Sequence, residues 1–160
     1  MLTLRKEDFV FRASNFDLTN EWNILRIIAG AFMFPHMLGK FIDWAPDPVT
    51  VGFFAKAGFV PGDAWVWIAA TSEGLAGAFL VLGLCTRFAA LGAAAVLGIA
   101  AYALFAVKGF GWVWNKGGFE YPIFWGITCL AIAMHEFKRV LAEGGQPAGA
   151  YRTAKLSPQA

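Results

Sequence analysis

Residues 73–104 have the sequence EGLAGAFLVLGLCTRFAALGAAAVLGIAAYAL, and this stretch points to the class of protein. It contains two long apolar runs that only Cys85 and Thr86 separate. The runs belong to segments of about 63–84 and 87–107, close to the roughly 20 residues with which an α-helix crosses about 30 Å of hydrocarbon. The short connection predicts two antiparallel transmembrane helices that are direct neighbours.

Two further apolar segments flank this pair, at about 21–44 before it and at about 119–135 after it. A segment in lipid must satisfy its own backbone hydrogen bonds, so we expect each of them to be helical. A closed β-barrel would need at least about eight strands of alternating polarity, and the sequence has no such alternation. The predicted fold class is therefore all-α, an integral membrane four-helix bundle.

The composition excludes several other classes. Hydrophobic residues make up 58% of the chain and charged residues 15%, with a mean hydropathy of +0.56, whereas a soluble domain carries about 25% charged residues. The net charge of +2 is too small for a nucleic-acid binder. Two cysteines cannot build a disulfide framework or a cysteine-rich metal site. The lipid bilayer is thus the expected immediate partner.

The polar segments complete the predicted organisation. A membrane domain over residues 21–136 follows a polar N-terminal tail at 1–20, in which we expect no signal peptide. A polar tail at 137–160 follows the domain, and an outer loop at 45–62 joins the first two spans. Within that loop, TVGFFAKAGF (50–59) is compatible with a short helix lying in the interface.

The distribution of basic residues predicts the topology. Four spans place both termini on one side, which collects nine lysines and arginines against four on the other side. This bias favours cytoplasmic termini in a bacterial-type inner membrane. The nine are Arg5, Lys6, Arg12, Arg26, Arg87, Lys138, Arg139, Arg152 and Lys155, and the four are Lys40, Lys56, Lys108 and Lys116. Tryptophans of an interfacial belt fall at the outer ends of the spans, at Trp44, Trp65, Trp67, Trp112 and Trp114.

Ionisable residues within the spans are the candidate functional residues, because such groups are costly in lipid. His36 and Lys40 are four residues apart and share a helix face. Glu73 is near the middle of its span, on a face with alanine and glycine neighbours that allow another helix to approach closely. We expect a polar cluster inside the bundle, with Glu73 deepest, His36 next, and Lys40 and Glu120 near the outer rim.

Two interpretations of this cluster stay open. It could only fix the register of the helices through compensating charges. It could instead bind a small polar or quinone-like ligand, with Glu73 and His36 as a proton relay and with Lys40, Glu120 and Arg87 as ligand-binding residues. Ion or solute passage is a further alternative. Arg87 itself could anchor on lipid headgroups or bind a partner. The sequence shows no evident site for metal, haem or flavin.

Three sequence pieces, taken in order, resemble the DoxX family of small four-helix membrane proteins. They are RIIAGAFMFPHMLGKF (26–41), with an Arg before His-x-x-Gly-Lys, EGLAGAFLVLGLCTRFAAL (73–91), and GGFEYP (117–122). The resemblance covers about residues 22–136, and it makes His36, Lys40, Glu73, Arg87 and Glu120 the polar positions within family motifs. A short motif that many members carry after the fourth helix is replaced here by HEFKRVLAE.

The resemblance implies a choice of functions. Some relatives are membrane subunits of thiosulfate:quinone oxidoreductase, and others are linked to redox stress or accompany other proteins. We therefore expect a redox-associated, quinone-linked membrane subunit, with quinone as the candidate cofactor and with electrons supplied by a protein partner. The alternatives are a non-enzymatic accessory or scaffold subunit of a larger membrane complex, or a homo-oligomer, and a small-solute transporter.

Overall fold

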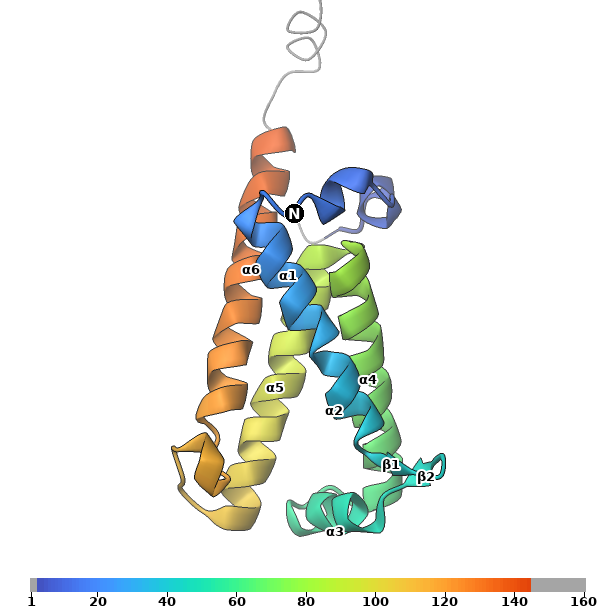
Figure 1. Ribbon diagram of the computed structural model, residues 1–160, viewed down its shortest axis with the longest axis vertical. Helices are drawn as coiled ribbons and strands as arrows, with labels where there is room; N and C mark the ends of the chain where they lie inside the picture. Colours follow the sequence, from blue (N-terminus) through green and yellow to red (C-terminus); the bar gives the residue numbers. More distant parts are fainter. Residues whose placement is uncertain (1–2, 145–160) are drawn as a thin grey trace, which may run out of the picture.

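The computed structural model describes residues 3–144, which fold into helices connected by short turns (Figure 1). The α-helices are α1 (Glu21–Ala31), α2 (Met33–Leu38), α3 (Pro48–Lys56), α4 (Gly62–Leu82), α5 (Thr86–Lys108) and α6 (Glu120–Gly144). Short 3-10 turns lie at Lys6–Phe9, Ala13–Phe16 and Trp114–Lys116. A small hairpin pairs two antiparallel strands of two residues each, β1 (Phe41–Ile42) and β2 (Ala45–Pro46). The all-α class is confirmed, with this hairpin as the addition.

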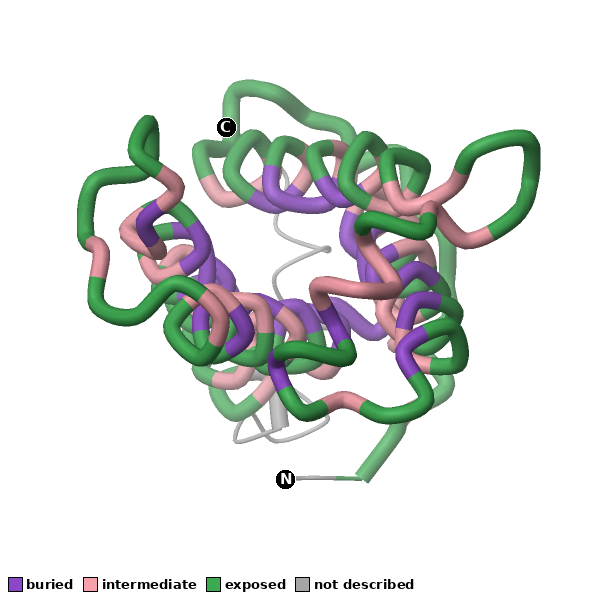
Figure 2. Tube along the Cα trace, turned by 90° about the horizontal axis from the view of Figure 1, so that it is seen from below, coloured by how far each residue is buried: buried purple, intermediate pink, exposed green. Residues whose placement is uncertain are grey.

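The long helices pack side by side around one core. α5 packs on α4 and on α6, and α1 packs on α4 and α6. The buried residues face inward and the exposed ones outward (Figure 2). The core is made of small and apolar side chains, mainly Ala29, Met33, Leu80, Ala90, Ala93, Leu97, Trp125, Cys129 and Ile132. Small residues on α5 let its neighbours approach closely, as expected for helices that pack in lipid.

The two ends of the bundle differ. One end, called the termini end below, carries residues 3–20, the turn between α4 and α5, and the last turns of α6 (Figure 1). The other end, called the loop end, carries the hairpin and α3. Residues 109–118, between α5 and α6, lie at the loop end too.

The first predicted segment is not one helix. The prediction of a continuous helix over 21–44 is wrong, because α1 ends at Ala31, Phe32 interrupts it, and α2 ends at Leu38. Pro35 explains the interruption, since it has no N–H to donate to the carbonyl of residue 31 and its ring crowds that carbonyl. Beyond α2 the chain reverses in the hairpin, whose turn residues Asp43 and Trp44 have φ values of 49° and 65°.

The crossing of α1 and α4 is built on two glycines. A Cβ on Gly30 would lie 2.8 Å from the carbonyl oxygen of Gly77 and 2.7 Å from Cβ of Leu80. A Cβ on Gly77 would in turn lie 2.8 Å from the carbonyl oxygen of Gly30. The two backbones can therefore touch only because both positions lack a side chain. This contact sets the position of α2, one helix further on, relative to α4.

The N-terminal segment is docked rather than being a loose tail. The backbone N–H of Cys85 donates to the carbonyl of Asp8 at 2.7 Å, and Asn15 Nδ2 donates to the carbonyl of Leu82 at 3.2 Å. Arg87 Nη2 pairs with the Asp8 carboxylate at 2.7 Å. These contacts connect residues 3–20 to the turn between α4 and α5.

The last helix is longer than predicted. The sequence suggested a span ending near His135 and a polar tail from residue 137, whereas α6 continues to Gly144. An ion pair between Glu136 and Arg139, three residues apart at 2.7 Å, supports this extension. The remainder of the predicted tail, 145–160, lies outside the described residues.

Candidate functional site

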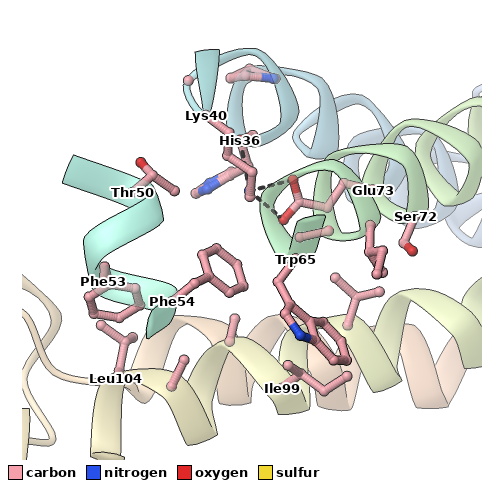
Figure 3. A pocket seen from close by; sticks show the side chains of 17 residues that line it. His36, Lys40, Thr50, Phe53, Phe54, Trp65, Ser72, Glu73, Ile99 and Leu104 are labelled. Atoms are coloured by element: carbon pink, nitrogen blue, oxygen red, sulfur yellow. Dashed lines mark hydrogen bonds and ion pairs between the residues drawn. The ribbon is translucent and has the colours of Figure 1, made fainter. Parts of the chain in front are cut away.

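A cavity of about 420 Å³ opens between α2, α3, α4 and α5 near the loop end (Figure 3). Most of its lining is apolar, and a few polar groups gather on one wall. The apolar wall includes Pro35, Phe53, Phe54, Trp65, Ile68, Val96, Ile99 and Leu104, and the polar groups are His36, Lys40, Thr50, Ser72 and Glu73. A mostly apolar cavity with a few convergent polar groups is the usual form of a small-ligand site.

The polar wall is organised by an ion pair between two helices. Lys40 Nζ donates to Glu73 Oε2 at 2.6 Å and to Oε1 at 2.8 Å (Figure 3). It also donates to the backbone carbonyl of His36 at 2.9 Å. The Lys40 and Glu73 side chains are only 14% and 10% exposed. All three ammonium hydrogens can therefore be satisfied by oxygen acceptors in a largely dry environment.

Local structure explains why these two groups meet. Lys40 follows the last turn of α2, where its ammonium reaches an unsatisfied helix carbonyl. Glu73 is one turn before Gly77 on α4, near the close crossing with α1. Gly74 makes room for α2 as well, since a Cβ there would lie 2.6 Å from Sδ of Met37. Small residues on α4 thus bring α2 within reach of the Glu73 carboxylate.

His36 joins this wall through its ring rather than through the ion pair. Its imidazole centroid lies 5.4 Å from the Trp125 ring and 6.4 Å from the Tyr121 ring, both on α6. Among the described residues, the ring nitrogens of His36 have no hydrogen-bond partner. The residue is exposed and lines the cavity, so its nitrogens are available to a ligand.

A second cavity, of about 310 Å³, lies on the α6 side of the same polar wall. It shares His36, Glu73, Ala100 and Leu104 with the first cavity. Its own lining includes Trp114 from the loop before α6, together with Tyr121 and Trp125. His36 and Glu73 therefore stand between two hollows, one facing α3 and one facing α6.

α3 forms one side of the first cavity, and Asp47 fixes where this helix begins. The Asp47 carboxylate accepts hydrogen bonds from Val49 N and Thr50 N, both at 3.1 Å, and from the Thr50 hydroxyl at 2.8 Å. These bonds, led by the one from the Thr50 hydroxyl, lower the pKa of Asp47 below its ordinary value. The cap orients Thr50 and the two phenylalanines that follow it.

The structure separates the other predicted site residues from this cavity. Glu120 is the first residue of α6 and lines neither hollow. Arg87 lies at the termini end, roughly 20 Å along α5 from Ala100. It is 2% exposed, pairs with Asp8, and its guanidinium lies over the rings of Phe88 and Phe137. Only Glu73, Lys40 and His36 come together, and their roles stay predictions.

Several lining residues escaped the sequence analysis. Thr50, Phe53 and Phe54 on α3 were expected only as part of an interfacial helix, and Trp65 only as part of the aromatic belt. Tyr121 was not singled out, although it lies within the GGFEYP motif. No spacing rule links the α3 positions to Glu73, because the fold of the loop between α2 and α4 brings them there. Trp65, in contrast, lies eight residues before Glu73 on the same face of α4.

The chemistry available at the polar wall is hydrogen bonding and proton exchange. The His36 imidazole can donate to an acceptor oxygen, Lys40 can do so if it gives up its bond to the His36 carbonyl, and the Glu73 carboxylate can accept a proton. Within residues 3–144 no group of three His, Cys, Asp or Glu side chains gathers as a metal site. The aromatic side chains around the wall offer flat surfaces against which a planar ring can pack.

Comparison with known proteins gives one match. The sequence model of the family described as DoxX matches residues 22–108, from the start of α1 to the end of α5. Two of the three motif pieces, at 26–41 and 73–91, fall inside the match, whereas the piece with Glu120 falls outside it. No curated protein and no solved structure matches the chain.

Proposed function

Because the chain belongs to the DoxX membrane-protein family, we propose that it is a four-span membrane protein that binds a quinone at the polar wall formed by Lys40, Glu73 and His36. α4 and α5 are the two described helices that are long and apolar enough, by length and composition, to cross a membrane. Only 28% of the most apolar stretch of each helix is buried. Lipid would cover the large apolar remainder.

The other two crossings belong to α6 and to the broken pair α1–α2. α6 has 25 residues, and the α1–α2 pair, over residues 21–38, rises by about 27 Å. With four crossings, the basic residues of the termini end lie in the cytoplasm and the Trp-rich loop end lies outside. The Lys40–Glu73 wall then lies in the outer half of the membrane.

One observation carries the ligand proposal: a nearly dry Lys–Glu ion pair forms the polar wall of an otherwise apolar cavity. A quinone matches this wall, because its ring and tail are apolar and its two carbonyl oxygens accept hydrogen bonds. His36 would donate to a carbonyl oxygen, and Lys40 would do so by exchanging its hydrogen bond to the His36 carbonyl for one to the quinone. Reduction of a quinone to a quinol takes up two electrons and two protons, so a partner protein would supply the electrons and Glu73 with His36 would pass on protons.

The test is the quinone content of the purified protein. Organic extracts of wild-type protein in mild detergent should contain quinone in stoichiometric amounts. Extracts of Glu73→Gln and Lys40→Met should contain several-fold less. Lys56→Gln is the matched control, since it removes a lysine from α3 that does not line the cavity. Quinone missing from the wild type, or retained equally by all variants, overturns the proposal.

A second candidate function is that of an accessory subunit that docks a partner at the loop end. The observation that favours it is the hairpin tip, where Trp44 is 87% exposed, together with Phe110 at 79% and Trp114 at 63% in the loop before α6. Aromatic side chains of this kind are enriched at protein interfaces as well as in membrane belts. Purification in a gentle detergent tests this function. A stoichiometric partner that co-purifies with the wild type but not with Trp44→Ser supports it, and migration of the wild type as a plain homo-oligomer contradicts it.

A further inference from the structure

A third cavity, of about 200 Å³, lies at the termini end and differs from the first two in its polarity. Its lining comes from the N-terminal segment, the start of α1, the turn between α4 and α5, and the last turns of α6. Polar and charged side chains dominate it: Arg12, Ser14, Asn15, Asn20, Asn23, Arg26, Thr86, His135, Glu136 and Arg139. We call this the basic cavity below.

The basic cavity has an excess of positive charge. Three arginines line it against one carboxylate, that of Glu136. Arg139 pairs with Glu136 at 2.7 Å, so this pair is neutral. Arg12 is exposed, and no carboxylate among the described residues pairs with it. The formal excess is therefore two positive charges, carried by Arg12 and Arg26.

Arg26 is held in place by backbone carbonyl groups rather than by a salt bridge with a described residue. It is 4% exposed, and Nη1 donates to the carbonyls of Leu80 and Val81, the latter at 3.0 Å. Nη2 donates to the carbonyl of Asn15. Carbonyl oxygens satisfy the N–H groups of a guanidinium but leave its full charge. The Glu136 carboxylate also interacts electrostatically with Arg26, but it is already paired with Arg139, so the cavity keeps an excess of positive charge that a bound anion would offset.

The wall also offers an unused donor at a helix start. Thr86 is the first residue of α5, is 8% exposed, and its hydroxyl has no hydrogen-bond partner among the described residues. The N-terminus of this 23-residue helix adds a partial positive charge at the same place. Gly83, at φ 71°, closes the wall, since a Cβ there would lie 2.6 Å from Asn15 Nδ2 and 3.1 Å from Arg26 Nη1.

We propose that the basic cavity binds a phosphate-type oxyanion, with Arg12 and the Thr86 hydroxyl as direct ligands and Arg26 as a fixed charge behind them. Two sources share this chemistry, the phosphodiester headgroup of an anionic lipid and a free phosphate ion. Basic pockets between transmembrane helices on the cytoplasmic side suit anionic headgroups. The site lies at the opposite end of the bundle from the Lys40–Glu73 wall and does not depend on the quinone proposal.

Native mass spectrometry in detergent tests the lipid source. Phosphatidylglycerol and phosphatidylcholine are titrated separately into delipidated wild-type protein, Arg12→Gln and Thr86→Val. Arg12 is exposed and extended just before the 3-10 turn at Ala13–Phe16, so its replacement should leave the fold intact, and thermal unfolding checks this. Loss of one charge-assisted contact should weaken phosphatidylglycerol binding about tenfold. Lys56→Gln, which removes a lysine at the loop end, should bind as the wild type does.

Line broadening of inorganic phosphate in ³¹P NMR spectra of the same delipidated proteins tests the free ion. Selective phosphatidylglycerol binding that Arg12→Gln and Thr86→Val weaken supports the lipid form of the site. Phosphate broadening that both variants abolish, without a preference for phosphatidylglycerol, supports the free-ion form. If neither probe binds, or if both variants bind like the wild type, the proposal is overturned, whatever the quinone content of the preparations.

Discussion

The carbonyl oxygen of Gly30 lies 2.8 Å from the point where a Cβ on Gly77 would stand. This contact between α1 and α4 determines how close α2 comes to α4, and so whether Lys40 reaches Glu73. The helix crossing and the polar wall are therefore parts of the same arrangement. A change at either glycine should alter the contact between Lys40 and Glu73.

Gly77→Val should separate α1 from α4, because the new side chain would meet the backbone of Gly30 and Cβ of Met33, which lies 3.1 Å from the Cβ position. We expect a destabilisation of roughly 1–3 kcal/mol from overpacking, measured by thermal unfolding in detergent. Gly98→Val on α5 is the control, since nothing lies within 4 Å of a Cβ there. Equal stability of the two variants would contradict a glycine-dependent crossing.

Lys40→Met should leave the Glu73 carboxylate buried without its partner. Breaking a buried pair from one side costs roughly 3–5 kcal/mol, whereas replacing both partners by apolar side chains is close to neutral. The double variant Lys40→Met/Glu73→Leu should therefore be more stable than Lys40→Met alone. A thermodynamic cycle built from unfolding in mixed detergent micelles measures the coupling, and additive effects would show that the pair does not act as a unit.

The start of α3 should depend on pH through Asp47. Because hydrogen bonds lower its pKa in the folded protein below 3.8, the cap stabilises the helix above pH 3.8 and is lost as the pH falls through the folded pKa. Amide hydrogen exchange of Val49–Phe53, corrected for the intrinsic rate, should accelerate in this acidic window. In the Asp47→Ala variant, amide exchange of these residues should be faster at neutral pH and should show no acceleration at acidic pH. The Asp63→Ala variant should behave as the wild type.

The thiol of Cys85 should react slowly with iodoacetamide at neutral pH. Burial raises its pKa, and the negative charge of Asp8 raises it further. Asp8→Asn removes that charge and breaks the ion pair with Arg87, so the labelling rate at pH 7.5 should rise at least about threefold. Peptide mass mapping separates Cys85 from Cys129.

Asp17→Asn is the control for this labelling, because the Asp17 carboxylate binds only Thr19 among the described residues. Unchanged labelling of Cys85 in Asp8→Asn would mean that the docked N-terminal segment does not protect the thiol.

Arg87→Lys should destabilise the termini end although it keeps the charge. The guanidinium carbon lies 4.7 Å from the Phe88 ring centre and 5.8 Å from the Phe137 ring centre. Nε and Nη1 of Arg87 are buried and have no hydrogen-bond partner within the described chain, so the guanidinium depends on its packing against these two rings. An ammonium group cannot stack in this way. We expect a loss of about 1–2 kcal/mol in unfolding measurements, and full stability of Arg87→Lys would show that charge alone suffices.

Much of the architecture was accessible from residue patterns. The apolar runs before and after Cys85 predicted two long helices with a tight turn, because only helices satisfy the backbone in a bilayer. α4 and α5 match this expectation within a few residues. The motif pieces at 26–41 and 73–91 indicated the DoxX family, which the family match confirms. Both are local properties of the chain, so they need no knowledge of distant contacts.

The candidate site was only partly accessible. The expectation that ionisable side chains from separate segments converge rests on the high cost of a lone charge in lipid, and Lys40 does meet Glu73. The same rule placed Glu120 near them, yet it lines neither hollow. A cost argument says that a charge needs a partner, but it does not say which partner is in reach.

By itself, the sequence determined the helical class, the family, and the pairing of α4 with α5, since hydropathy and turn length can be read directly from the residues. Only the tertiary structure decided that α3 closes the cavity beside Glu73 and that Arg26 is buried in the basic cavity. These features depend on how closely helices approach one another. That distance is set by contacts such as the one between Gly30 and Gly77, which are 47 residues apart in the sequence.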